Sequence, residues 1–115
     1  MGPYAEFGII NKFDKSKDYS SYDARKYKCI HIPDFIINKW WNDLVLVKTY
    51  FHCYDNPGYA LARWGVTLIP PESLENFYEI VAKDKRSKSS VELIALLQLI
   101  RKAINENKYI IHYGV

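Results

Sequence analysis

Three histidines and two cysteines are the residues of this sequence with the most evident chemistry. His31, His52 and His112 each lie in a segment expected to form a strand, and Cys29 is two residues before His31. Imidazole and thiolate are common ligands of zinc and similar metals. The local spacing, however, has none of the CxxC, HxxxH or HExxH patterns of metal sites. We therefore expect no metal and no cofactor, and we interpret the histidines as hydrogen-bonded members of a half-buried sheet.

A cysteine nucleophile beside a histidine base is the second chemistry that these residue types allow. Such a pair needs a thiolate, a hydrogen-bonded base and a third group that orients the base. No sequence signature surrounds Cys29 or Cys53, and Cys53 falls on an apolar strand face, where a thiol is inert. The five glycines are isolated and form no phosphate-binding pattern. We therefore assign no catalytic residue, and the sequence argues against an enzyme.

Tyrosine is the other unusual residue, with ten copies. Tyrosine and arginine are enriched where proteins bind one another, because each combines a large contact area with a polar end. Several of these residues fall on one face of a hairpin expected over residues 49–65. The candidate binding residues are Tyr50, His52, Tyr54, Tyr59 and Arg63.

The same hairpin presents its other face to the core. Thr49, Phe51 and Cys53 alternate with the candidate residues and are grouped with small and apolar residues of the returning strand. The turn is expected either at Pro57-Gly58, since proline presets φ and glycine accepts a positive φ, or as a four-residue loop from Asp55 to Gly58.

The remaining elements follow from hydrophobic period and helix-start signals. Strands are expected over residues 4–11, 27–32 and 109–114, with a long polar loop at 12–26. A short helix should run from Phe35 to Leu44, with Asp34 as its N-cap.

Two further helices are expected in the second half of the chain. One begins at Pro71, where the missing N–H costs nothing. A basic linker, 83–89, separates it from a helix that opens on a Ser89–Glu92 capping box. That helix has an apolar stripe at helical spacing, made of Leu93, Leu96, Leu97, Ile100 and Ile104.

This order of elements, β-β-α-β-β-α-α-β, predicts a single α+β domain over residues 1–115. It lacks strict βαβ alternation, so we expect a largely antiparallel sheet of about five strands with three helices. If the helices gather on one face, the other face of the sheet stays partly open.

Composition narrows the classes of function. The 115 residues carry 16 Lys and Arg among 13 Asp and Glu, for a net charge of +3, which makes nucleic-acid binding unlikely. No apolar run is long enough for a membrane span. Two cysteines and the absence of a secretory signal at the start favour a cytoplasmic protein. The abundance of Lys, Ile, Tyr and Asn is typical of bacterial and phage proteins.

We therefore expect a small non-catalytic cytosolic recognition module of bacterial or phage origin. It would bind a protein partner, or a second copy of itself as a homodimer, through the aromatic and basic sheet face. The alternative is a small enzyme or ligand-binding protein with a His/Tyr/Arg pocket, in which His52 is the acid–base group and Arg63 binds an anion. The sequence does not identify the partner, a small-molecule ligand or the oligomeric state.

Overall fold

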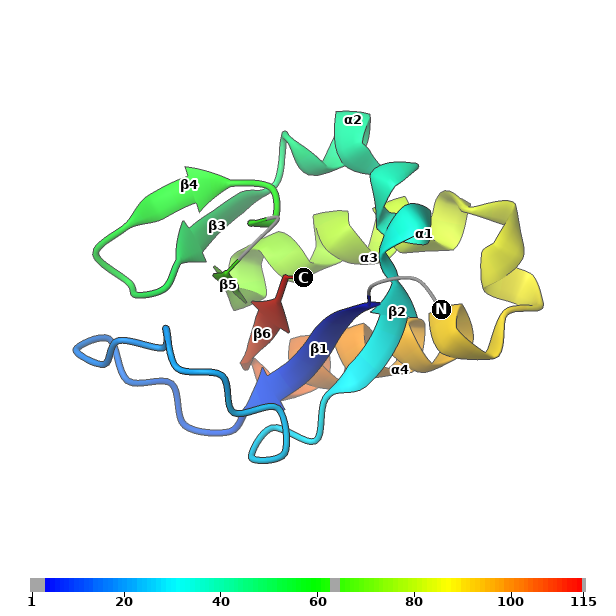
Figure 1. The fold of residues 1–115 in the computed structure, drawn as a ribbon. Helices are drawn as coiled ribbons and strands as arrows, with labels where there is room; N and C mark the ends of the chain where they lie inside the picture. Colours follow the sequence, from blue (N-terminus) through cyan, green and yellow to red (C-terminus); the bar gives the residue numbers. More distant parts are fainter. Residues whose placement is uncertain (1–3, 63–64, 115) are drawn as a thin grey trace.

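A six-stranded antiparallel sheet is the centre of the computed structural model, which describes residues 4–62 and 65–114. The last strand of the chain, β6, lies in the middle of the sheet, between β1 and β5 (Figure 1). The spatial order is β2-β1-β6-β5-β3-β4. The strands are β1 (Tyr4–Ile10), β2 (Ile30–Pro33), β3 (Lys48–Phe51), β4 (Pro57–Tyr59), β5 (Val66–Ile69) and β6 (Tyr109–Tyr113).

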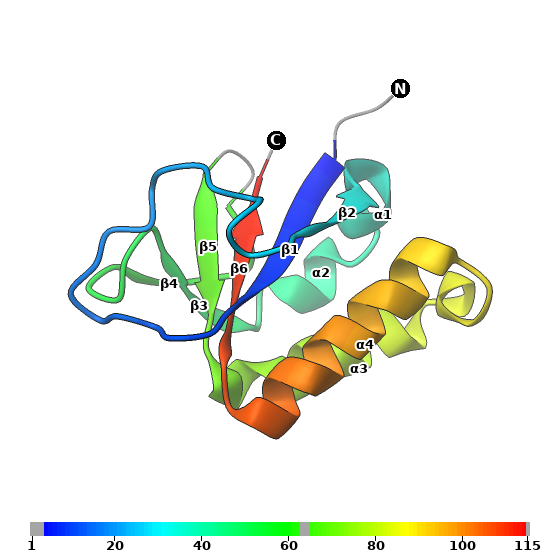
Figure 2. The same ribbon diagram turned by 90° about the horizontal axis from the view of Figure 1, so that it is seen from below.

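The helices gather on one face of the sheet, which we call the inner face. The two long helices, α3 (Leu74–Lys83) and α4 (Val91–Glu106), lie side by side there (Figure 2). Two short helices, α1 (Asp34–Asn38) and α2 (Trp41–Leu44), complete the layer, with 3-10 turns η1 (Pro71–Ser73) and η2 (Lys85–Lys88). The fully buried core between helices and sheet includes Phe7, Ile32, Ile69, Leu74, Phe77, Leu93, Leu96, Ile100 and Ile110.

The predicted α+β fold with an antiparallel sheet is confirmed. The described residues form six strands where about five were expected, and four α-helices where three were expected. The additional helix arises because the 35–44 segment bends into a tight turn between α1 and α2. There Lys39 and Trp40 donate their amides to the carbonyls three residues earlier. This bend brings the Trp40 indole within 2.8 Å of the Asp84 carboxylate.

Two predicted helix starts shift by one residue. Asp34 is the first residue of α1, after an N-cap at Pro33, and its side chain makes no capping bond. Ser90, rather than Ser89, caps α4: its hydroxyl accepts from the amide of Leu93 at 3.3 Å. In both cases a residue next to the predicted cap occupies the N-cap position, and of the two only Ser90 caps its helix through its side chain.

The predicted hairpin turn at Pro57-Gly58 is wrong. Both residues belong to β4, where Gly58 pairs with Thr49 and Pro57 with Tyr50 of β3. The chain turns earlier, over residues 52–56, and His52 takes a left-handed φ of 66° there. A Cβ at position 58 would overlap the ring of Phe51, so glycine lets this ring lie close to the β4 backbone. The strand that follows, β5, pairs with the other side of β3, so β3 is an interior strand.

The outer face of the sheet is not open, contrary to expectation. Residues 11–29, which we call the outer loop, contain no regular helix or strand and pack across this face (Figures 1 and 2). Tyr19 of the loop is only 4% exposed. It belongs to a second apolar cluster with Ile10, Tyr50, Val66, Leu68, Ile111 and Tyr113. The segment is polar on average, but its aromatic residues supply enough apolar surface to cover the sheet.

The basic linker after α3 is also ordered by contacts. Asp84 accepts the backbone amide of Arg86 at 2.9 Å and forms two bonds with its guanidinium, the shorter one 2.6 Å long. These bonds, with the indole bond from Trp40, lower the pKa of the Asp84 carboxyl. The linker therefore ties α1 and α2 to the end of α3.

Candidate functional site

A stack of aromatic rings fastens the outer loop to the sheet. The ring of Phe13 lies parallel to that of Tyr109 of β6, with 3.7 Å between centroids. It is also parallel to the ring of Tyr19, at 5.4 Å. The Tyr19 hydroxyl accepts the Asp14 amide at 2.9 Å, and the Tyr19 amide donates to the His52 carbonyl at 2.7 Å. The loop and the β3–β4 hairpin are therefore joined into one surface.

Tyr50 and Tyr54, two of the predicted binding residues, belong to this stack. Their ring centroids are 4.8 Å apart, and the ring of Tyr54 also contacts Phe13 edge-on at 6.2 Å. Tyr50 is only 8% exposed, and burial together with Tyr54 raises its pKa. Tyr54 is half-buried, with the Lys15 ammonium 4.8 Å from its ring centroid. Tyr50 thus supports the surface, whereas Tyr54 forms part of it.

His52 occupies an unusual position in the hairpin turn. Its backbone is left-handed, its amide donates to the Val66 carbonyl at 3.1 Å, and its ring lies against Gly65. Its Nδ1 atom is buried and has no hydrogen-bond partner among the described residues. A strained backbone and an unsatisfied ring nitrogen at one residue are typical of functional positions.

Tyr59 is the most exposed of the predicted binding residues. It lies in the edge strand β4, opposite Lys48, and 60% of its surface is exposed. Side chains two residues apart along a strand share a face, so Tyr59 and Lys48 lie on the same outer face as Tyr50. Arg63, the fifth predicted residue, lies outside the described residues.

The three histidines do not converge. Phe7 and Glu6 are neighbours in β1 and so point to opposite faces. His112 pairs with Phe7 and faces inward, whereas His31 pairs with Glu6 and faces outward. His112 is 2% exposed, its ring centroid is 4.9 Å from that of Phe7, and burial lowers its pKa to about 3. No group of three or more metal-ligating side chains occurs in residues 4–62 and 65–114.

His31 instead belongs to a small polar cluster at the edge of the sheet. Its Nε2 atom lies 3.2 Å from one Glu6 oxygen, and the Tyr22 hydroxyl donates to the other. The bond to Glu6 raises the pKa of Tyr22 to about 12. Cys29 lies beside this cluster, and burial raises its pKa to about 12, so the thiol is not a ready nucleophile.

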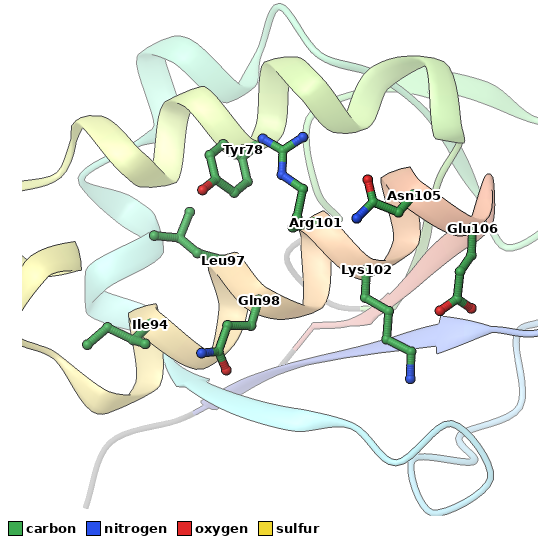
Figure 3. A pocket seen from close by; sticks show the side chains of 8 residues that line it. All are labelled: Tyr78, Ile94, Leu97, Gln98, Arg101, Lys102, Asn105 and Glu106. Atoms are coloured by element: carbon green, nitrogen blue, oxygen red, sulfur yellow. The ribbon is translucent and has the colours of Figure 1, made fainter.

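A hollow of about 490 Å³ lies between α3 and α4, away from the sheet (Figure 3). Arg101 lies across it, with its guanidinium carbon 4.3 Å from the Tyr78 ring centroid. The same guanidinium reaches Glu75 at 3.3 Å. None of the predicted binding residues that the structure describes lines this hollow, and two of its charged groups, Arg101 and Glu106, are already paired with Glu75 and Lys108.

The class of the protein is therefore an α+β domain with a layered, loop-covered antiparallel sheet. No helix in the described part of the chain has the length and apolar character to span a bilayer. Comparisons with protein-family models, with curated proteins and with solved structures find no match to this chain.

Sequence reasoning missed the contribution of the outer loop to this surface. Lys15 and Lys17 place their ammonium groups over the rings of Tyr54 and Tyr19, at 4.8 and 4.9 Å. The sequence does contain a sign of this contribution, because aromatic residues recur through the outer loop, which is otherwise polar. Such residues are uncommon in exposed loops and indicate that the segment packs on something.

Proposed function

We propose that this chain is a small non-catalytic recognition module that binds a protein partner through its outer surface. The recognition surface is made by Lys15 of the outer loop with Lys48, Tyr54 and Tyr59 of the hairpin. The proposal retains Tyr54 and Tyr59 from the sequence prediction and assigns Tyr50 and His52 a supporting role beneath them.

One observation carries the proposal: a long irregular segment is held in a defined conformation against the outer face of the sheet. Loops of this length without regular structure are uncommon in compact domains and are usually functional when ordered. Aromatic stacking and the Tyr19–His52 backbone bond fix the loop against the β3–β4 hairpin, which carries the exposed ring of Tyr59 in β4. A pre-ordered surface loses little conformational entropy when a partner binds.

The chemistry of the surface suits an acidic partner. Lys15 and Lys48 supply positive charge, and the tyrosines supply flat contact area with a polar end. The free thiols Cys29 and Cys53 fit a reducing compartment, so we place this function in the bacterial cytoplasm.

Photo-crosslinking from a single position tests the proposal. A photoreactive phenylalanine analogue replaces Tyr59 in one variant and Phe35 in the other, and the protein is expressed in the cells that carry its gene. Phe35 is a matched control, because it is 63% exposed but lies in α1. We expect a discrete cross-linked product from position 59 that is absent from position 35. A product near twice the 13.5 kDa chain mass identifies a second copy as the partner.

One additional substitution tests whether the cross-link depends on the charge of the surface. Lys15→Glu should reduce the product from position 59, because it reverses one of the two positive charges of the surface at an exposed side chain. Identical products from both positions, or no product at position 59, would contradict a recognition role for this face.

A further inference from the structure

Three adjoining hollows border the end of the outer loop nearest α4 and β2. Their volumes are about 400, 170 and 360 Å³. The first two share Asn11, Lys26 and Tyr27, and the last two share Lys28. They therefore follow one another along the surface, away from the hairpin.

Positive charge dominates the lining of these hollows. We call them together the basic furrow, after the six cations that line it, which are Lys12, Lys17, Arg25, Lys26, Lys28 and Lys102. Five of these come from the outer loop, and Lys102 reaches the furrow from α4, the helix that carries it in Figure 3. The outer loop therefore concentrates basic residues on this part of the surface, and folding adds Lys102 to them.

The acidic residues of the furrow form no close ion pair with these cations, and Asp14 interacts with Lys17 only at a longer range. Asp14 accepts both the amide and the hydroxyl of Ser16, at 2.9 and 2.6 Å. Glu6 is held by Tyr22 and His31. Within the described part of the chain, none of the six cations forms an ion pair within 4.0 Å. Their charge is therefore available to a ligand.

Aromatic rings alternate with the cations. The Lys17 and Lys26 ammonium groups lie 4.9 and 5.6 Å from the ring centroids of Tyr19 and Tyr27. Tyr22, in the third hollow, is 66% exposed, and its hydroxyl is fixed by Glu6. A basic track with an exposed, oriented ring is the arrangement that holds single-stranded nucleic acid, where phosphates meet cations and a base stacks on the ring.

We propose that the basic furrow binds single-stranded nucleic acid along its phosphate backbone, with Tyr22 as a stacking platform. An acidic protein segment would satisfy the cations, but it would leave the Tyr22 ring without a flat partner. The sequence argued against nucleic acid because its basic residues are interspersed with acidic ones, but in the fold Lys102 joins the basic residues of the outer loop.

Fluorescence anisotropy with labelled oligo(dT) and oligo(U) of about 12 nucleotides tests the proposal. Neutralising up to six phosphates predicts that log affinity falls with log salt at a slope of up to about −4. Tyr22→Ala should weaken binding about tenfold, the scale of one lost stacking contact. These two readouts separate backbone contact from base stacking.

Charge-reversal pairs supply the matched control. The combination Lys26→Glu with Lys102→Glu should weaken binding more than tenfold. The pair Lys85→Glu with Lys88→Glu makes the same change of charge on η2, outside the furrow, and should alter affinity less than threefold. All four side chains are exposed, so folding is retained. Lys28 is left unchanged because its backbone φ is 52°, where a substitution disturbs the loop.

Three outcomes would overturn the proposal. They are no saturable binding at about 50 mM salt, equal losses in the two charge-reversal pairs, and polyglutamate that competes as well as the oligonucleotide at equal charge. The last outcome would assign the furrow to an acidic protein. None of them bears on Tyr59 cross-linking, so this proposal and the recognition function can fail separately.

Discussion

Tyr19→Ala is the most informative substitution, because Tyr19 holds the outer loop in place. Its ring is 4% exposed and stacks on Phe13, its hydroxyl accepts the Asp14 amide, and its own amide donates to His52. The substitution removes the ring and the hydroxyl but keeps the backbone bond. The loop should therefore lose its docking free energy while the helix-packed core stays intact.

The magnitude follows from the buried area. A buried tyrosine ring removes about 150–200 Å² from water, worth about 4 kcal/mol at 25 cal/mol per Å². Residual burial in the undocked loop reduces this value by up to about 40%. The lost hydrogen bond adds about 1 kcal/mol. We expect a net loss of about 3 kcal/mol in loop docking, which increases the open population about a hundredfold.

Limited proteolysis measures that population directly. The outer loop carries six tryptic sites, and cleavage there reports local opening when closing is faster than cutting. Tyr19→Ala should be cut in the loop about a hundredfold faster than the parent protein. Tyr59→Ala is the control: it removes an equally large but 60% exposed ring and should change stability by less than about 0.5 kcal/mol.

Equal cleavage rates in the parent protein and Tyr19→Ala would refute the reasoning. That result would mean that the loop is already open in solution or is held by other contacts. The outer face would then be available after all, and Tyr50 would return as a direct contact residue.

Three further predictions concern stability. Asp84→Ala should destabilise the protein by about 2 kcal/mol in urea unfolding, because it leaves the Trp40 indole and the Arg86 guanidinium without their acceptor. Asp43→Ala is the control. It removes one partner of the exposed Asp43–Lys83 pair and should cost less than about 0.5 kcal/mol. Buried His112, with its pKa lowered from 6.5 to about 3, is neutral in the folded state, so its contribution is present above pH 6.5 and is lost as the pH falls toward 3. Between pH 7 and pH 5 the unfolding free energy should drop by about 2 kcal/mol. If the His112→Gln variant shows the same drop over this pH range, other groups cause the effect. Tyr50→Ala should lower the unfolding free energy by about 3 kcal/mol, because the ring is buried. A loss of partner binding in this variant would therefore report on the stability of the fold and not on a direct contact. A decrease of less than about 1 kcal/mol would contradict the burial of Tyr50.

Local patterns determined several elements of this protein. The stripe from Leu93 to Ile104 predicts α4, because helical period and capping are decided within a few neighbouring residues. Alternation and β-branched residues likewise predict strands over residues 27–32 and 109–114, which overlap the observed strands β2 and β6. These signals are sufficient for the fold class, since the order of elements excludes a doubly wound sheet.

The arrangement of the outer surface was decided by tertiary structure. Pro57-Gly58 has the composition of a turn, but the neighbouring Phe51 ring and the pairing with β3 place it in a strand. A turn preference is weak compared with a set of cross-strand contacts, so context decides between the two. The local sequence around residue 57 carries no information about those contacts.

The outer loop is a second segment whose tertiary contacts cannot be predicted from its local sequence. Polar residues at 12–26 indicate a loop, and their local pattern does not show that Phe13 stacks on Tyr109, nearly a hundred positions later in the chain. Which face the loop covers depends on where β6 enters the sheet, and that position is fixed by pairing with β1 and β5. Element types follow from the sequence because neighbouring residues decide them. The candidate surface and the furrow require distant residues to meet, and only the folded chain brings those residues together.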